Sequence, residues 1–197
     1  MWLMALTMAS ALLASDAAQD RQVSTDLISE INAIRTDPAG YAKILEAYKS
    51  DYAGMEIRHP NQPIILTNEG VAAVDEAIAA LQAQKPLAPL TADSRLDLMA
   101  QDHVTDQGPT GLIGHDSTDG SSFAVRAGRH GIVTGSGEDI AYGASDARSV
   151  AIELIIDDGV PSRGHRLNIL NGAFKTIGTA CGPHAKYGYM CVIDFGM

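Results

Sequence analysis

The sequence predicts an α+β domain in which helices come mainly before a short C-terminal β-hairpin. Two observations lead to this fold class. Before residue 160, several segments carry apolar residues at helical spacing behind Ser, Thr or Asp caps. Near the C-terminus, two β-type runs at about 176–181 and 189–195 flank a turn that contains Gly and Pro. Helices and strands that are segregated along the chain in this way are typical of α+β domains.

Length and composition suit a single globular domain. A chain of this size buries about 70% of its unfolded surface, and 46% of the 197 residues are hydrophobic while 19% are charged. The net charge is −10, and the 14 Lys and Arg residues are scattered along the chain. Binding to a nucleic-acid backbone requires clustered basic residues. We therefore expect no nucleic-acid partner. We also expect the protein to be a monomer.

The N-terminal residues 1–18 are predicted to be a signal segment. An apolar run at residues 2–14 is followed by small residues that suit cleavage. The run is shorter than the roughly 20 residues that a membrane-spanning helix needs. No Lys or Arg precedes it, so an ordinary first helix stays open as the alternative. The signal interpretation predicts a secreted or periplasmic protein.

Two helices are predicted at the start of the domain. The first begins at a cap formed by residues 24–26, and apolar residues at 27, 28, 31 and 34 share one of its faces. Asp37 and Pro38 then end this helix and start the next, because Asp is a good cap and Pro fits the first helical position.

A loop and a third helix follow in the middle of the chain. Residues 51–68 contain Gly and Pro and read as a loop, in which residues 64–66 either pack or form a short strand. Residues 69–84 then predict an amphipathic helix, since their apolar residues fall on one face.

Three further helices are predicted before the hairpin. One opens at residues 91–94 and closes at Gly108, a short one covers 122–130, and one capped at 145–146 continues to about 157. Between the last two lies a segment rich in glycine, with a β-prone Ile132-Val133 and the element 137–141.

The two cysteines, Cys181 and Cys191, lie on the two predicted strands of the hairpin. The turn between them brings both sulfurs to facing positions, and an exported chain meets an oxidising compartment. We therefore expect a disulfide, with two free buried thiols as the alternative in a cytosolic protein. A loop of this size contributes about 3 kcal/mol to stability.

Residues 159–170 are the stretch around which a polar site is predicted. Gly and Pro allow a sharp loop, and His165 follows at the start of a short apolar helical turn. The partial positive charge at a helix start favours a neutral imidazole, which can accept a proton or bind a metal. Arg163 and Arg166 flank this histidine; they are expected to pair with a nearby Asp, with steering of an anionic ligand as the alternative.

Several other polar residues are candidates for the same polar site or for its support. His115 and Glu138 follow glycines in loops, where packing in a core would not select them. Asp157 and Asp158 precede the central stretch, and His103, on a predicted helix beside apolar residues, is expected to be a core or bracing residue.

Several segments of the chain match the motifs of a known family in that family's order: residues 27–35, 100–103, 114–115, 137–141, 164–170 and the hairpin from 177 to 195. Together they resemble the CAP superfamily of cysteine-rich secretory proteins, antigen 5 and pathogenesis-related proteins, which includes many exported bacterial proteins with an SCP-like domain. The resemblance spans residues 25–197.

The resemblance implies a three-layer α-β-α sandwich around a small antiparallel sheet. It also implies a cleft with two His and two acidic residues. Carried onto this sequence, the cleft residues are His115, Glu138, Asp157 and His165. The helix before the central stretch lacks the Trp that the family often has there, so Asp158 and Glu153 stay open as alternatives to Asp157.

Two functions follow from the resemblance. The first is a non-enzymatic extracellular or periplasmic module that binds a ligand, such as a lipid or a peptide, with peripheral membrane contact left open. The second is a metal-assisted hydrolase of the peptidase type, with Glu138 or Asp157 as general base. In either case His115 and His165 are the candidate ligands for zinc or another divalent cation.

Overall fold

The computed structural model describes residues 2–60, 63–133 and 135–197, with side chains from residue 16 onward. The predicted signal segment, residues 1–18, therefore lies largely outside the described side chains and stays a prediction. Within the described residues, no helix combines the length and the apolar character needed to cross a bilayer.

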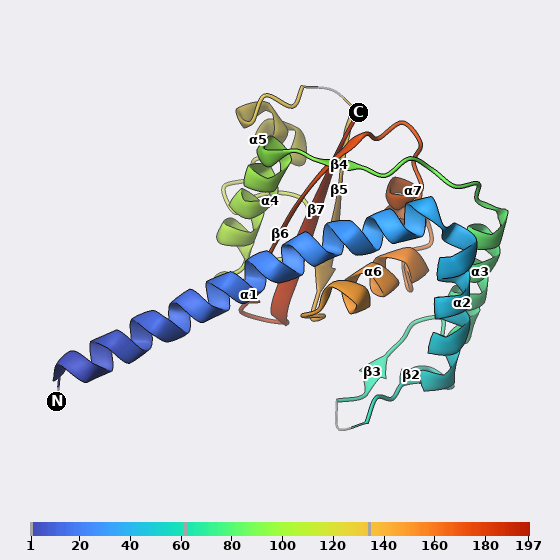
Figure 1. Ribbon diagram of the computed structural model, residues 1–197, viewed down its shortest axis with the longest axis horizontal. Helices are drawn as coiled ribbons and strands as arrows, with labels where there is room; N and C mark the ends of the chain where they lie inside the picture. Colours follow the sequence, from blue (N-terminus) through green and yellow to red (C-terminus); the bar gives the residue numbers. More distant parts are fainter. Residues whose placement is uncertain (1, 61–62, 134) are drawn as a thin grey trace.

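A four-stranded sheet forms the middle layer of the molecule (Figure 1). The strand order is β4-β6-β7-β5, so β5 is an edge strand. The predicted C-terminal hairpin is β6 and β7, and both β6 and β5 pair with β7 antiparallel, while the short β4 pairs with β6 in parallel. The bounds are β4 Thr91–Ala92, β5 Ser136–Tyr142, β6 Thr176–His184 and β7 Gly188–Gly196.

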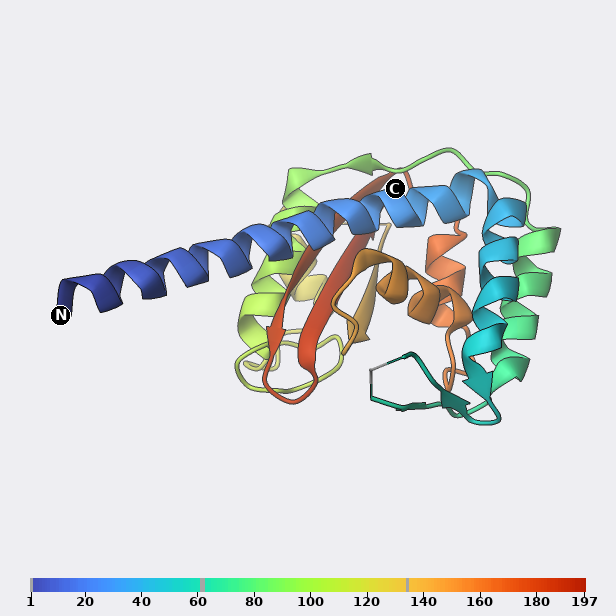
Figure 2. The same ribbon diagram turned by 60° about the horizontal axis from the view of Figure 1, so that its bottom comes forward.

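Helices cover both faces of this sheet and confirm the predicted α-β-α sandwich. On one face lie α1, α6 and α7, with α2 and α3 packed against each other beside them, and on the other face lie α4 and α5 (Figures 1 and 2). The bounds are α1 Trp2–Thr36, α2 Pro38–Tyr48, α3 Val71–Ala83, α4 Ser94–Gln107, α5 Phe123–Arg129, α6 Ala147–Ile156 and α7 Gly164–Ile169.

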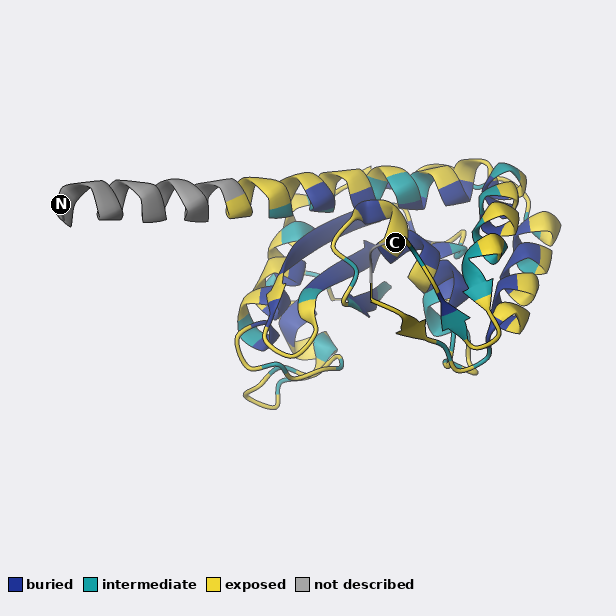
Figure 3. Cartoon of the chain, turned by 90° about the horizontal axis from the view of Figure 1, so that it is seen from below, coloured by how far each residue is buried: buried dark blue, intermediate teal, exposed yellow. Residues whose placement is uncertain are grey.

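Alternation of side chains along the strands gives each face its own core. On the α1 side, Ala141 and Ile193 pack with buried residues of α1, α2, α3 and α6. On the α4 side, Ile140 and Val192 pack with Ala100 of α4. Because successive strand residues point to opposite faces, Glu138 and Asp139 must face different helical layers. Figure 3 shows the strands as the most continuously buried part of the molecule.

A second, smaller sheet follows α2. After a 3-10 turn at Lys49–Asp51, β1 (Tyr52–Ala53), β2 (Glu56–Ile57) and β3 (Ile65–Leu66) pair antiparallel in that order. The short-strand alternative for residues 64–66 is therefore confirmed at β3.

Most predicted helix starts are confirmed by their caps. The Asp37 side chain accepts a hydrogen bond from Gly40 N at 2.9 Å, with Pro38 at the first helical position. Asp93 and Asp146 cap α4 and α6 in the same way, and Ser122 caps α5. These side chains satisfy backbone N–H groups that a helix start leaves without partners.

The predicted helix start at residues 24–26 is wrong. The helix α1 runs without interruption from Trp2 to Thr36. The hydroxyls of Ser24 and Thr25 donate to the carbonyls four residues earlier, at 2.8 and 2.9 Å, instead of accepting from the next turn. A Ser or Thr inside a helix commonly bonds this way, so the residue type alone does not mark a boundary.

The last strand before the hairpin is β5. It begins at Ser136 and contains the element 137–141, whereas the β-prone pair Ile132-Val133 lies outside any strand. The predicted disulfide is confirmed, since Cys181 and Cys191 are bonded and face each other in the β6–β7 register.

Candidate functional site: two acid–histidine pairs at the sheet edge

The first pair joins His115 to Glu138 on the α4 side of β5. Nδ1 of His115 lies 2.9 Å from Oε1 of Glu138. The glutamate side chain is 1% exposed and the histidine ring 52% exposed. Since a carboxylate acceptor favours the tautomer with a proton on Nδ1, this contact leaves Nε2 of His115 as the nitrogen available to solvent.

Arg126 of α5 holds this pair in place, and sequence reasoning did not single it out. Its guanidinium is buried, forms an ion pair with Oε2 of Glu138 and donates to the carbonyl of His115 at 3.1 Å. A buried carboxylate needs such a partner, because an unpaired charge in the interior costs several kcal/mol. An Arg near the C-terminus of a short helix carries no local signal for this role.

A set of hydrogen bonds fixes the loop that carries His115. Nε2 of His103 lies 2.9 Å from the carbonyl of Gly114, and Gln107 donates to the same oxygen at 3.0 Å. The N–H of Gly114 donates to the hydroxyl of Tyr142 at 2.9 Å. Burial lowers the pKa of His103, so it braces the loop as a neutral ring, as its helical position predicted.

The second pair joins His165 to Asp157 on the α6 and α7 side. Nδ1 of His165 lies 2.7 Å from Oδ1 of Asp157. The second oxygen of Asp157 accepts from the backbone N–H of His165 at 2.9 Å. Asp157 adopts a left-handed conformation at the end of α6, with φ of 60°, and this turn aims its buried carboxylate at the start of α7.

The effect of the helix start on the pKa of His165 is opposed by the carboxyl groups around the ring. Burial lowers the pKa of this ring, but the hydrogen bond to Asp157 and the charges of Asp139, Asp157 and Glu153 outweigh burial and raise it above its ordinary value. A hydrogen-bonded carboxylate favours the charged imidazolium, whereas the start of the short α7 favours the neutral ring.

The two arginines of the central stretch tie it to α3. Arg163 forms ion pairs with Glu69 and Glu76, at 2.6 and 2.7 Å, and donates to the carbonyl of Asp157 at 2.8 Å. Arg166 forms an ion pair with Glu76 at 2.7 Å. The expected Asp partners are thus replaced by two glutamates, and the network positions the loop before His165.

The alternatives for the second acid have other roles. Asp158 accepts from the N–H groups of Asn68 and Glu69 at 2.6 and 2.8 Å. Burial raises the pKa of Glu153 to about 7, against the opposing charge of His165. Glu153 keeps an exposed surface, so contact with water limits that rise. Among the three candidates, Asp157 alone is hydrogen-bonded to His165.

A groove of about 750 Å³ lies beside the second pair. Its walls come from the β1–β3 segment, the end of β5, the loop after it, and α6. Asp157, His165 and Glu153 line this groove, whereas His115 and Glu138 are not among its lining residues.

Hydrogen bonds therefore join the four predicted residues two by two, His115 with Glu138 and His165 with Asp157. They are grouped as two acid–histidine pairs that approach β5 from opposite faces, because Glu138 and Asp139 alternate across the sheet. Among the described residues, no three His, Cys, Asp or Glu side chains are placed to hold a metal. Each pair offers one imidazole oriented by a carboxylate, which resembles a metal ligand with its supporting acid but falls short of a three-ligand site.

Two buried aspartates near the pairs were not predicted. Asp139 faces α7 and bonds Asn168 at 2.7 Å, and Asp194 lies opposite Glu138 in the β5–β7 ladder. Both are 0% exposed, and burial raises both pKa values well above the ordinary range. An Asp within an apolar strand is the one signal in the sequence that points to them.

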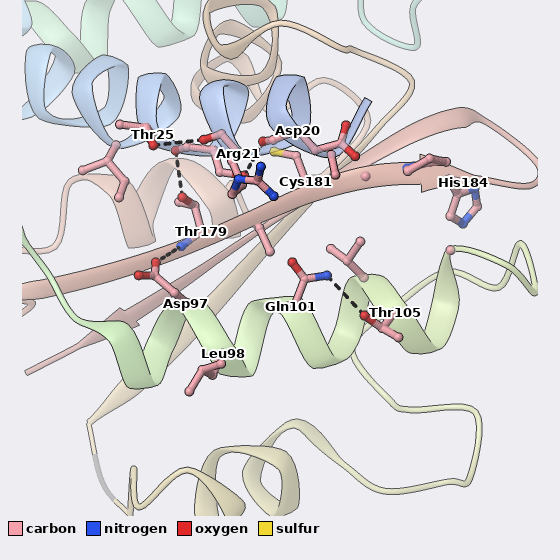
Figure 4. Close-up of a pocket in the computed structure, with 18 of the residues that line it drawn as sticks. Asp20, Arg21, Thr25, Asp97, Leu98, Gln101, Thr105, Thr179, Cys181 and His184 are labelled. Atoms are coloured by element: carbon pink, nitrogen blue, oxygen red, sulfur yellow. Dashed lines mark hydrogen bonds between the residues drawn. The ribbon is translucent and has the colours of Figure 1, made fainter. Parts of the chain in front are cut away.

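A second hollow of about 970 Å³ lies between α1, α4 and β6, away from both pairs. Figure 4 shows side chains from these three elements around it. Thr179 of β6 spans it, with its hydroxyl donating to the carbonyl of Ser24 at 2.8 Å and its N–H donating to Asp97 at 2.9 Å.

The fold and the site define a three-layer α-β-α domain with acid–histidine pairs at the free edge of its sheet. The model of the cysteine-rich secretory protein family, CAP, matches residues 28–195. The chain belongs to this family.

Solved structures that match part of this chain come from three bacteria. An extracellular protein containing an SCP domain from Bacillus anthracis is 25% identical, with a TM-score of 0.47 over 56% of this chain and 34% of that one. An outer surface protein from Borrelia burgdorferi is 21% identical, with a TM-score of 0.48 over 56% of this chain and 78% of that one. A cysteine-rich secretory protein from Staphylococcus aureus is 13% identical, with a TM-score of 0.43 over 70% of this chain and 43% of that one.

This chain therefore matches about a third of the length of the Bacillus anthracis protein. No curated protein matches the sequence.

Proposed function

We propose that this protein is an exported module that binds a ligand non-covalently in the groove beside Asp157 and His165. The observation that carries the proposal is the groove itself, about 750 Å³ in volume and lined by both apolar and ionisable side chains. Ligand sites are commonly concave, largely apolar and equipped with a few placed polar groups. The extracellular and outer-surface origin of the similar solved structures motivates the export part of the proposal.

A metal-assisted hydrolase is the second candidate. It is favoured by the contact of 2.7 Å between His165 and Asp157, which resembles a general base oriented by a carboxylate. One observation weighs against it, since His115 does not line the groove that holds His165. Each pair supplies one imidazole, which is fewer than the three protein ligands of a usual catalytic zinc site.

The binding function is tested by filling the groove. Ser149 lines it from the exposed face of α6, so Ser149→Trp should block any occupant without disturbing the core. Ser29→Trp places the same ring on the exposed face of α1 and serves as the control. Wild type and Ser29→Trp should bind a dansylated fatty acid or a labelled extended peptide in a saturable way, and Ser149→Trp should not. Binding of neither probe contradicts the proposal.

The hydrolase is tested by turnover. Wild type, His115→Ala and His165→Ala are incubated with labelled casein, with and without Zn²⁺, and Zn²⁺ binding is followed by calorimetric titration. The binding function predicts no turnover by any of the three. Casein cleavage by wild type that His165→Ala abolishes, together with loss of stoichiometric Zn²⁺ binding, would replace the proposed function with the second candidate.

A further inference from the structure

The groove is bordered by the free edge of β5. Two backbone hydrogen bonds, from Gly143 N to Tyr189 O and from Met197 N to Gly135 O, show which alternate residues of the β5 segment have their backbone groups bonded to β7. In an antiparallel pair only alternate residues exchange bonds, so the backbone groups of Ile140 and Tyr142 point away from β7. Both residues line the groove, and no other strand in the described part of the chain pairs with β5 on that side.

The opposite wall of the groove ends in another free strand edge. Strand β3 pairs only with β2 within the described residues. Thr67 N donates to Met55 O, and because only alternate residues of an antiparallel pair exchange such bonds, the backbone N–H and C=O of Leu66 point away from β2. Ile65 and Leu66 line the groove while remaining 49% and 78% exposed. Figures 1 and 2 show this segment beside α6. Exposed apolar residues on an open edge are typical of a surface that another strand covers.

The charged side chains that line the groove indicate which kind of peptide strand would bind there. Four carboxylates line the groove, and no Lys or Arg does; its other ionisable lining residues are His59, His165 and three tyrosines. Three of the acids have protein partners: Asp146 caps α6, Asp157 bonds His165, and Asp158 bonds the backbone of Asn68 and Glu69. Glu153 is exposed and lies near His165 and the backbone of Tyr142, at the edge of β5. The whole chain carries a net charge of −10.

We propose that the ligand is an extended basic peptide that adds as a strand to the free edge of β5, with apolar side chains on Ile65 and Leu66 and a basic side chain at Glu153. The proposal rests on the proposed function, since it uses the same groove. Strand addition supplies backbone hydrogen bonds, and alternate side chains supply specificity. Successive side chains of a strand point to opposite sides. In a peptide that alternates basic and apolar residues, the basic side chains can therefore face Glu153 while the apolar side chains face Ile65 and Leu66.

Fluorescence anisotropy with a labelled peptide that alternates Lys and Val tests the proposal. Wild type should bind it, and Leu66→Ser and Glu153→Gln should each weaken binding about tenfold, the effect of roughly 1.4 kcal/mol. The matched controls are Leu98→Ser, which changes an exposed leucine of α4, and Glu46→Gln, which removes a carboxylate of α2 outside the groove. The controls should bind as wild type does. Equal binding of a peptide that alternates Glu and Val would contradict the charge argument.

Hydrogen exchange tests the strand itself. The Lys–Val peptide should slow amide exchange in residues 138–143, and N-methylation of alternate peptide bonds should abolish both this protection and the binding. Binding without protection of β5 overturns strand addition. If the dansylated fatty acid binds and Ser149→Trp blocks it while the Lys–Val peptide does not bind, the peptide inference fails and the proposed function stands. If neither probe binds, the proposed function fails as well.

Discussion

At the scale of single residues, the state of His165 depends on the carboxylate that holds it. Asp157 occupies a left-handed backbone position that turns its side chain from the end of α6 to the start of α7. The same carboxylate both anchors the new helix and raises the pKa of the ring. One side chain thus links the local backbone to the chemistry of the groove.

Replacing Asp157 with Asn should lower the pKa of His165. The wild-type ring should titrate above 6.5, its ordinary value, as followed by NMR. A raised pKa stabilises the fold fully below the unfolded value, and this contribution is lost as the pH rises through the folded value. Asp157→Asn should therefore lose the most stability, relative to wild type, at acidic pH. Asp158→Asn is the control, since Asp158 bonds Asn68 and Glu69 instead; an equal effect in both variants would contradict the assignment.

Replacing Arg126 with Gln should strongly destabilise the protein. The change leaves Glu138 buried without its ion-pair partner, at a cost of about 3–5 kcal/mol. The measurement is urea denaturation followed by circular dichroism. Arg129 lies on the same helix with 51% of its side chain exposed, so Arg129→Gln should change stability by less than about 0.5 kcal/mol. Similar losses for both variants would show that Arg126 has no special role.

At the scale of helices and strands, capping side chains explain where helices begin, and backbone hydrogen bonds between strands explain where the sheet ends. Asp37 and Asp93 can be recognised as helix caps from the sequence, because a helix follows each of them directly. Ser24 and Thr25 have suitable side chains but lie inside α1, where they bond preceding carbonyls. Local sequence could not distinguish these cases, since the choice depends on whether the upstream residues continue the helix.

Alanine substitutions should separate the real cap from the apparent one. Asp37→Ala should lower the free energy of unfolding by about 1 kcal/mol, because Gly40 N loses its acceptor. Thr25→Ala should change it by less than about 0.5 kcal/mol, since Ala favours the helix interior and the hydroxyl sits on an exposed face. Urea denaturation of both variants is the measurement, and a larger loss for Thr25→Ala would restore the predicted helix start.

At the scale of the whole molecule, the sheet separates two cores and two acid–histidine pairs. The disulfide between Cys181 and Cys191 joins its central strands at facing positions. It lies within the larger core, together with residues of α1 and α6. The hairpin is therefore fixed covalently where the longest strands of the sheet meet.

Removing this disulfide should lower stability by about 2–3 kcal/mol, since it closes a loop with a sequence separation of 10. The comparison is urea denaturation of wild type with and without a phosphine reductant, and of the Cys181→Ala, Cys191→Ala double variant. The double variant should show no effect of reductant. An unchanged midpoint for reduced wild type would mean that the hairpin is held by packing alone.

The sequence by itself determined the fold class, the family, most helix starts, the disulfide and the identity of the residues in both acid–histidine pairs. These features depend on caps, periodicity and motifs that act over a few residues. The pairing of His115 with Glu138 and of His165 with Asp157 was decided by tertiary structure, because adjacent residues of β5 face opposite layers. The same holds for Arg126, for the raised pKa of His165 and for the groove, which arise from segments that meet only when the chain is folded.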